Sequence, residues 1–318
     1  MSSTVAVIVN FNSGPLLGPA LDRLASQRVE ATVVIDNASH DLSWQDALGR
    51  DRVRLHRLEA NRGFAAAVNY ALAATREPYV FLLNADVEMA DGYVAYLADA
   101  LDAAPRVAGA TGTLTLPSGL IDSTGITFTR ARCAFDRGRG ATAAPAEPEE
   151  PFAVSGAACL LRRDAVAQVG GMWEELFVYW EDTEVAWRMR RAGWRFAHVP
   201  AARAVHARGS DSADATFIEA AEFGGRLAAI ARNEGWRGLV NPEALLATLV
   251  SGARLAVRHR AALRTSRPWD RVRTGLAARQ SDELPQDRPK FAPHPWRAWL
   301  TAQFTGRRRG LGALPASP

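Results

Sequence analysis

The sequence predicts an α/β protein with a doubly wound, mostly parallel sheet and a helical extension at the C-terminus. Short runs of Val, Ile, Leu and Phe alternate with segments of helical periodicity through about the first hundred residues. This alternation is typical of βαβ units whose parallel strands are buried on both faces. Each apolar run ends in Asn, Asp, Ser or Gly, the usual turn formers. With 318 residues and 48% apolar side chains, the chain is long enough to bury such a sheet.

The first part of the chain is predicted to contain βαβ units. Apolar, β-branched runs indicate buried strands, and leucines between the first two runs recur at helical spacing. We expect strands at residues 5–9, 31–35, 53–57 and 79–83, and helices around residues 16–24 and 65–75.

The pattern changes after residue 109. Short segments with Gly, Ser and Pro at residues 109–125 predict a hairpin, and the Gly-, Ala-, Pro- and Glu-rich residues 137–151 predict a loop. Further elements are expected at residues 152–161 (strand), 163–166 (start of a short helix), 183–191 (helix) and 195–199 (strand), with a final segment at 204–209.

Polar residues follow the predicted strands at the points where they end. In a doubly wound sheet the ligand lies beyond the carboxyl ends of the strands, so these side chains are expected to meet in one crevice. Because Asn, Asp and Gly also form turns, a purely structural role stays open for each of them. The residues concerned are Asn10 and Asn12, Asp36 and Asn37, Asn61 and Gly63, and Asn84 and Asp86.

Three carboxylates, Glu181, Asp182 and Glu184, follow an apolar run. Like charges this close are unfavourable unless a positive partner is near or one acid must stay basic enough to accept a proton. The cluster is therefore a candidate active site. The alternative is that Asp182 caps the helix predicted at 183–191, with Glu184 in its first turn. The arginines of that helix, Arg188, Arg190 and Arg191, are expected to face solvent or to reach phosphates, without a catalytic role.

Composition narrows the classes of function. Cys133 and Cys159 are the only cysteines, which argues against a disulfide framework or a cysteine-based zinc site. We recognise neither a secretory leader nor an apolar stretch long enough to span a bilayer, and we expect a cytoplasmic protein. The first strand is not followed by G-x-G-x-x-G, so a nicotinamide-dependent dehydrogenase is disfavoured.

Charge divides the chain at about residue 222. Residues 223–318 carry 17 Arg or Lys against 6 Asp or Glu, a net charge of +11, which leaves −7 for residues 1–222. We expect an N-terminal domain over residues 1–222 and a basic, mainly helical extension over residues 223–318. In the extension, a proline-rich connector at 285–295 precedes Trp296, Trp299 and an arginine run at 307–309.

The basic extension has three interpretations. Trp and Leu beside Arg are typical of a helix at an anionic membrane surface. The alternative is a helical extension that packs on the N-terminal domain or on a second copy in a homodimer. Nucleic acid is not an expected partner, because no recognition motif accompanies the charge.

Five segments of the sequence occur in the order and spacing of family 2 glycosyltransferases. They are residues 7–12, 34–39, 61–69, 82–86 and 179–194. They span the chain from about residue 4 to about residue 210 and resemble the rhamnosyltransferase-like branch of that family. The resemblance implies the nucleotide-diphospho-sugar transferase fold, with residues 1–222 as a single Rossmann-like catalytic domain.

Carried over to this sequence, the resemblance implies a nucleotide-sugar site at the strand ends. Asp36 and Asn37 would hold the base and ribose, while Asn61, Gly63 and Asn69 would shape the nucleotide pocket. The donor favoured is dTDP-rhamnose, with UDP-linked sugars as the alternative. Asn10, Asn12 and Asn84 complete the expected donor side.

The resemblance also implies a divalent metal. Asp86 matches the last acid of the family's metal motif, and His206 falls where members often place a histidine near the metal or the diphosphate. The implied cofactor is Mg²⁺ or Mn²⁺, which offsets charge on the leaving diphosphate. The sequence departs from the family pattern here, because Asn84-Ala85-Asp86 has one acid where two are common.

Asp182 matches the catalytic base of an inverting transfer, which takes the proton of the attacking acceptor hydroxyl. Glu181 is expected to orient the acceptor or tune Asp182, and Ser155 and Gly156 to line the acceptor side. Trp180 is expected to stack on a sugar ring, with a place in the core as the alternative. The resemblance thus implies an inverting glycosyltransferase of cell-envelope or polysaccharide synthesis, with a saccharide or lipid-linked saccharide as acceptor, positioned at the inner membrane face. The alternative is a noncatalytic nucleotide- or saccharide-binding protein that keeps the fold.

Overall fold

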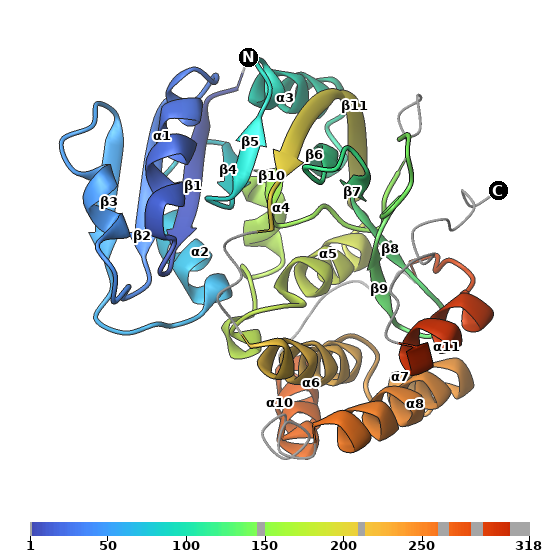
Figure 1. Cartoon of the computed structure of the whole chain (residues 1–318). Coiled ribbons are helices and arrows are strands. Elements are labelled where there is room, and N and C mark those ends of the chain that lie inside the picture. Colours follow the sequence, from blue (N-terminus) through green and yellow to red (C-terminus); the bar gives the residue numbers. More distant parts are fainter. Residues whose placement is uncertain (1, 145–149, 209–213, 260–266, 281–288, 306–318) are drawn as a thin grey trace.

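A computed structural model describes residues 2–144, 150–208, 214–259, 267–280 and 289–305. Its centre is a nine-stranded sheet in the order β3-β2-β1-β4-β10-β6-β11-β5, with β7 paired to β6 (Figure 1). Six strands share one direction, and β10, β5 and β7 run against them. The sheet is therefore mostly parallel, as predicted. Its strands are β1 (Thr4–Asn10), β2 (Ala31–Asp36), β3 (Val53–Arg57), β4 (Tyr79–Leu83), β5 (Val87–Met89), β6 (Val107–Thr115), β7 (Ile121–Ser123), β10 (Ala158–Arg162) and β11 (Arg195–His206).

The apolar runs become central strands because both faces of the sheet are covered. Along β1, Val5 and Val7 face one core while Ala6 and Ile8 face the other, and all four are buried. Side chains of a strand alternate between the two faces, so a strand covered on both sides must be apolar throughout. The expected bounds of β3 and β4 agree with the structure, and β1 and β2 extend slightly further.

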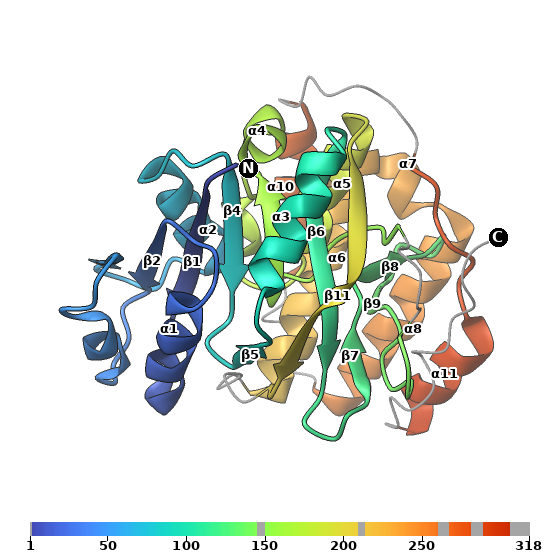
Figure 2. The ribbon, with the colours of Figure 1, turned by 90° about the horizontal axis from the view of Figure 1, so that it is seen from above.

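Helices cover both faces of the sheet (Figure 2). The leucines of α1 and the apolar side of α3 pack in one core, and α2, α4 and α5 pack in the other. Short 3₁₀ helices connect these layers. The elements are η1 (Gly14–Leu16), α1 (Leu17–Ala25), η2 (Ser43–Ala47), α2 (Phe64–Ala73), α3 (Tyr93–Ala103), α4 (Arg163–Gln168), η3 (Glu174–Leu176) and α5 (Glu181–Arg191).

The middle of the chain differs from the sequence-based expectation in two places. Strand β10 begins at Ala158 rather than at residue 152, because Phe152 and Ala153 instead exchange backbone hydrogen bonds with Ile126 of another hairpin. The segments expected at 195–199 and 204–209 are one strand, β11, interrupted by an irregularity between His198 and Arg203. The hairpin expected at 109–125 exists as β6 and β7, and β6 also pairs within the main sheet.

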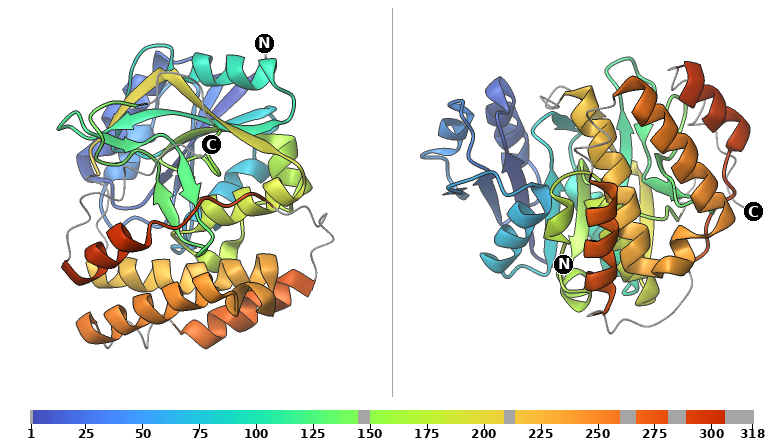
Figure 3. Two further views of the ribbon diagram at one scale, coloured as in Figure 1. Left: turned by 90° about the vertical axis from the view of Figure 1, so that its right-hand side faces the viewer. Right: turned by 90° about the horizontal axis from the view of Figure 1, so that it is seen from below.

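The C-terminal helices form a further layer beneath the sheet and its helices (Figure 3). Buried Arg226 of α6 donates to the carbonyls of Ala131 (2.6 Å) and Arg132 (2.7 Å) in the β8–β9 turn and to that of Ala244 in α8 (3.0 Å). The layer comprises α6 (Ala215–Glu234), α7 (Trp236–Leu239), α8 (Pro242–Arg258), α10 (Pro268–Gln280) and α11 (Trp296–Thr305), beside the hairpin β8 (Ile126–Phe128) and β9 (Ala134–Asp136).

The expected division of the chain can be compared with this layer. The boundary predicted between residues 222 and 223 lies inside α6, and the two-domain division stays a prediction. Parts of the predicted loop 137–151 and of the connector 285–295, and the whole arginine run 307–309, lie outside the described residues. No helix among the described residues is long and apolar enough to cross a membrane.

Candidate active site

A cavity of about 480 Å³ lies between the sheet and the C-terminal helices. Eight of the candidate site residues predicted from the sequence line it: Asn84, Asp86, Ser155, Gly156, Trp180, Glu181, Asp182 and His206. Residues of α6, α8 and α11 complete its wall, namely Glu219, Glu222, Phe223, Arg226, Ser251, Arg254, Leu255, Trp299 and Gln303. The fold therefore brings the candidate base, the candidate metal residues and the C-terminal helices to one space.

The segment before the two acids has an uncommon backbone conformation. Phe177, Tyr179 and Trp180 have φ angles of 66°, 64° and 74°, in the left-handed region that residues with a Cβ rarely adopt. The Phe177 carbonyl accepts a hydrogen bond from the Phe64 amide at 2.6 Å. Gly63 makes this approach feasible, because a Cβ there would lie 2.3 Å from the same carbonyl oxygen. Strain of this kind persists where the surrounding structure enforces it, and it clusters at functional sites.

Helix α5 begins at Glu181, so Asp182 lies in its first turn and is not the N-cap. Trp180 occupies the cap position and contributes no side-chain capping hydrogen bond. Half-buried Asp182 accepts from the Thr183 amide at 2.6 Å and from the Gly156 amide at 3.3 Å. The alternative in which Asp182 caps a helix at 183–191 is therefore wrong, and its carboxylate is held instead between its own helix and the Ser155-Gly156 turn.

The two acids share an environment that favours a bound proton. Burial, together with the neighbouring charge of Asp182, raises the pKa of Glu181 to about 8. Burial also raises the pKa of Asp182, although hydrogen bonds from Gly156 and Thr183 act in the opposite direction. Glu181 Oε2 is buried and has no hydrogen-bond partner among the described residues. The burial of both acids favours one shared proton, and the backbone N–H groups of Gly156 and Thr183 favour leaving the charge on Asp182.

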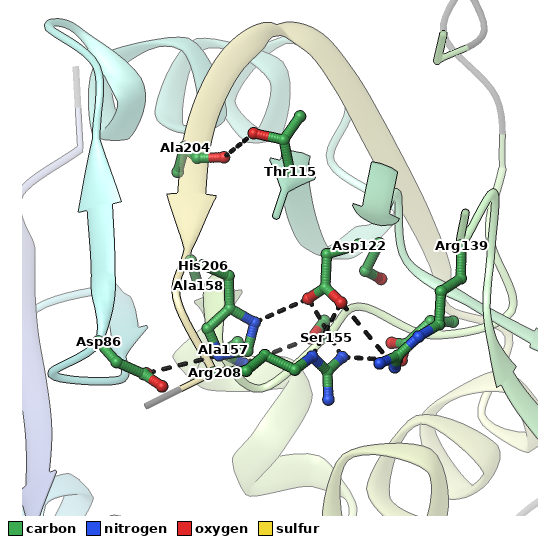
Figure 4. A network of polar contacts seen from close by, with 12 residues as sticks. Asp86, Thr115, Asp122, Arg139, Ser155, Ala157, Ala158, Ala204, His206 and Arg208 are labelled. Carbon is green, nitrogen blue, oxygen red and sulfur yellow. Dashed lines mark hydrogen bonds and ion pairs between the residues drawn. The ribbon is translucent and has the colours of Figure 1, made fainter. Parts of the chain in front are cut away.

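His206 connects two carboxylates at the other part of the cavity (Figure 4). Its Nε2 lies 3.4 Å from Asp86 Oδ1, and its Nδ1 lies 2.7 Å from Asp122 Oδ2. Burial lowers the pKa of His206, but the hydrogen bonds to Asp122 and Asp86 outweigh it and raise the pKa to about 9. Asp122 is fully buried and also accepts from Arg208 Nε at 2.8 Å. The imidazole is thus held in one orientation with Nε2 toward Asp86.

The residues present fit a divalent metal that takes most of its ligands from the substrate. Among the described residues no group of three or more His, Cys, Asp or Glu side chains has the geometry of a metal cage. Asp86 offers a carboxylate oxygen, and His206 an imidazole nitrogen once Nε2 gives up its proton to make room for the ion, while the other nitrogen is fixed by Asp122. Such a carboxylate behind a ligating histidine is the common way to orient it. Mg²⁺ and Mn²⁺ are often held by one or two protein ligands plus phosphate oxygens.

The residues expected on the nucleotide side lie at the ends of β1 and β2, where they are hydrogen-bonded to one another. Asn10 is buried, and its side-chain amide donates to Asp36 Oδ1 at 2.9 Å. The second oxygen of Asp36 accepts from Arg57 at 3.0 Å. Asn37 donates to the Gly63 carbonyl at 3.2 Å and accepts from the Arg62 amide at 2.8 Å. These contacts connect the three strand ends into one rim.

The remaining predicted residues hold loops in place. Asn12 Oδ1 accepts from the His40 amide at 2.8 Å, and Asn61 Oδ1 from the Gly63 amide at 2.9 Å. Asn69 donates to the Met172 carbonyl at 2.8 Å and accepts from the Met172 amide at 2.9 Å. None of these three lines the cavity of about 480 Å³. Asn69 instead anchors the segment that leads toward Glu181 and Asp182.

Glu184 and the arginines of α5 differ from expectation. Glu184 and Arg188 are fully buried, and Arg188 contacts Glu184 through Nε at 2.9 Å and Nη2 at 2.7 Å. Arg191 is also buried. The expectation that these arginines face solvent is wrong for Arg188 and Arg191. Arg188 instead donates to Glu184 and to the Val169 carbonyl after α4, and Asn233 of α6 contacts the same Glu184. Glu184 belongs to this ion pair and does not line the cavity.

Sequence reasoning missed Asp122, Arg139 and Arg208. Arg139 and Arg208 line the cavity, and both contact Asp122 and Asp136. Asp122 lies in a short hairpin with nothing in its neighbourhood to mark it. Arg208 follows His206 by two residues, and its proximity to a candidate ligand was the one available signal.

Comparison with known proteins gives the chain a family. The model of glycosyl transferase family 2 matches residues 5–170. Two curated relatives, each an N-acetylglucosaminyl-diphospho-decaprenol L-rhamnosyltransferase, come from Mycobacterium tuberculosis strains CDC 1551 / Oshkosh and ATCC 25618 / H37Rv. Each is 30% identical over 234 residues, which is 63% of this chain and 74% of the relative.

Solved structures agree in fold. GalNAc-T7 with UDP, GalNAc and Mn²⁺ is similar with a TM-score of 0.61 at 14% identity, covering 90% of this chain and 59% of its own, so this chain spans less than two thirds of that protein. The mannosyltransferase PcManGT from Pyrobaculum calidifontis, in complex with GDP-Man and Mn²⁺, has a TM-score of 0.54 at 19% identity and covers 88% and 86%. The chain belongs to glycosyl transferase family 2 and is a glycosyltransferase with the GT-A fold.

Proposed function

We propose that this glycosyltransferase inverts the configuration of a sugar, rhamnose by preference, as it moves it from a nucleotide diphosphate donor to a lipid-linked saccharide, with Asp182 as general base. The observation that carries the proposal is the cavity itself. Asp182 lines the same space as Asp86 and His206, so a proton acceptor and groups suited to a diphosphate can act on one bound sugar.

The proposed transfer is a single displacement. The acceptor hydroxyl oxygen forms a bond to the anomeric carbon while the bond from that carbon to the donor diphosphate breaks. The hydroxyl proton passes to Asp182, and the electron pair leaves with the nucleoside diphosphate. Glu181, protonated at neutral pH because its pKa is raised to about 8, can donate a hydrogen bond to the acceptor without adding a second negative charge.

Asp86 and His206 would hold the divalent ion, which when bound supplies positive charge that stabilises the leaving diphosphate. Arg139 and Arg208 line the same cavity and add two guanidinium groups to that side. Their contacts with Asp122 and Asp136 fix both arginines in place before substrate arrives. Preorganised cations of this kind stabilise developing negative charge without reorganisation.

The choice of substrates rests on the relatives. The curated relatives are named as rhamnosyltransferases for a saccharide carried on decaprenyl diphosphate, and the solved neighbours are complexed with UDP or GDP-Man and Mn²⁺. We propose a dTDP- or UDP-linked donor and an acceptor of the same lipid-linked class, used in cell-envelope synthesis. The enzyme would work in the cytoplasm at the inner membrane face.

The Asp182→Asn variant tests the base. We expect transfer to fall by about 10²- to 10⁴-fold, the usual contribution of general base catalysis, while calorimetric affinity for the nucleoside diphosphate changes by less than about twofold. Glu175→Gln, at an exposed carboxylate close by in the sequence, should leave both quantities unchanged. Transfer by Asp182→Asn at the wild-type rate would refute the assignment of the base.

Chelation tests the metal. Excess EDTA should abolish transfer, and Mg²⁺ or Mn²⁺ should restore it. Asp86 is the one acid of the Asn84-Ala85-Asp86 motif, so the protein would hold the ion through few ligands and the chelator would remove it. Full activity in excess chelator would show that the arginine side chains of the cavity stabilise the leaving diphosphate without a metal ion.

A further inference from the structure

The outer face of α8 is apolar along its whole length. Pro242, Leu245, Leu246, Leu249, Ala253 and Val257 recur at spacings of three and four residues and form what we call the α8 face. Leu245 is 42% exposed, Leu246 50%, Leu249 62% and Val257 86%. The opposite side of the helix is buried through Ala244, Ala247 and Leu255. An exposed helix face without one polar side chain is uncommon and marks an interaction surface.

The helix that carries this face also forms part of the active-site wall. Ser251, Arg254 and Leu255 of α8 line the cavity that holds Asp182. Helix α8 lies at the outer edge of the molecule (Figures 1 and 3), where its inner side packs on α6 through Leu255 and against the β8–β9 hairpin through Ala247. A surface in contact with the α8 face would therefore lie one helix diameter, about 10 Å, from the cavity.

A cation lies near each end of the helix. Exposed Arg237 precedes α8 and exposed Arg258 is its last residue, and Glu243 is the one acid within the helix. An apolar face bordered by arginines is complementary to an anionic lipid surface, where the apolar side chains enter the headgroup boundary and the cations meet phosphates. In a two-fold dimer through the same face, by contrast, each copy would bring its own arginines to the interface, and these like charges would repel one another.

We propose that α8 is a membrane-contacting helix that lies flat on an anionic bilayer through the α8 face. The proposed role of this contact rests on the proposed function, since a helix on the bilayer gives a lipid-linked acceptor a short route to the cavity. The inference concerns binding to lipid without substrate, so it can be measured separately from transfer.

Vesicle flotation with the full chain tests the proposal. Wild type should float with vesicles of phosphatidylcholine mixed with phosphatidylglycerol at low salt, and far less with phosphatidylcholine alone. Leu249→Glu should lower the partition coefficient by at least about tenfold. The variant loses one leucine side chain that would insert into the lipid, and it brings a negative charge to the anionic surface. The matched control is Leu48→Glu, since Leu48 is 57% exposed and lies outside the C-terminal helices. It should bind vesicles like wild type.

The outcomes separate this inference from the proposed function. Equal flotation of Leu249→Glu and Leu48→Glu, or no flotation of wild type at low salt, would overturn the membrane contact. A wild-type dimer in light scattering that Leu249→Glu converts to a monomer, without vesicle binding by either, would assign the face to a second copy. Nucleoside diphosphate affinity should be the same in both variants. If vesicles bind but no nucleotide sugar is used, the proposed function fails and the membrane contact stands.

Discussion

At the scale of single residues, Asp122 determines how His206 is presented. It is fully buried and bonds both the imidazole and Arg208. In Asp122→Asn the fixed negative charge behind the ring is lost, and we expect affinity for a nucleoside diphosphate with Mn²⁺ to fall about 10- to 100-fold by calorimetry. Asp136→Asn is the control, because Asp136 contacts the same two arginines as Asp122, Arg139 and Arg208, whereas the hydrogen-bond partner of His206 Nδ1 is Asp122. Equal affinities of the two variants would contradict an orienting role.

Glu181 makes stability depend on pH. Its pKa is raised from 4.5 to about 8 in the folded protein, so the fold favours the protonated form. The stabilisation is present below pH 4.5 and is lost as pH rises through about 8. Glu181→Gln cannot ionise, and in this interval its free energy of unfolding should gain on wild type by up to about 1.4 kcal/mol per pH unit.

Denaturant titrations of both proteins across that pH interval measure the difference. Glu175→Gln, at an exposed acid, should track wild type throughout. Parallel curves for Glu181→Gln and wild type would show that Glu181 ionises in the folded state as it does in the unfolded chain.

At the scale of elements, the turn at residues 177–180 decides where the acids lie. Gly63→Ala would place a Cβ 2.3 Å from the Phe177 carbonyl oxygen, at a φ of +84°. Gly119→Ala has a similar φ of +82° but no atom within 4 Å. The second variant should cost about 1–2 kcal/mol from backbone conformation alone. Gly63→Ala should cost more and also reduce transfer, because it displaces the turn that leads into α5 and so moves Asp182.

Equilibrium unfolding and transfer rates of the two alanine variants separate these effects. Equal losses of stability with unchanged transfer would mean that the contact between Gly63 and Phe177 does not position the acids.

At the scale of the whole molecule, a buried polar network joins the catalytic layers to the C-terminal helices. Glu184 of α5 receives Arg188 and also the amide of Asn233 in α6 at 3.3 Å. Arg188 additionally donates to the Val169 carbonyl after α4. The cavity depends on this junction, because one wall belongs to α5 and another to α6.

Arg188→Met should lower the free energy of unfolding by about 3 kcal/mol, since it removes the nearest cation of buried Glu184 and leaves Arg232 Nε at 3.6 Å as the remaining one. Arg23→Met is the comparison, because Arg23 and Glu88 form an exposed pair with side chains 46% and 64% accessible, and it should cost less than about 1 kcal/mol. Chemical denaturation measures both. A loss for Arg188→Met as small as that for Arg23→Met would show that the network does not hold the layers together.

The sequence by itself determined the sheet and the class of chemistry. Buried parallel strands must be apolar on both faces, so β1, β2 and β4 are visible as continuous runs, whereas the edge strand β3 carries charged side chains. The polar strand ends predict the ligand side. The motifs around Asp86 and Asp182 carried the resemblance to the family that the comparisons confirm. These signals are local, because each depends on residues close together in the chain.

Only the tertiary structure decided which side chains meet. Asp122 lies 84 positions from His206, and no periodicity or turn pattern records such a contact. The same is true of Arg188, which looks solvent-facing in the sequence but is buried against Glu184 and the Val169 carbonyl, and of the α8 residues that complete the cavity. Burial, and with it the raised pKa of Glu181 and the apolar face left outside on α8, depends on how layers pack. Packing is a property of residues distant in sequence, and for that reason the chain alone predicted the chemistry but not the complete site.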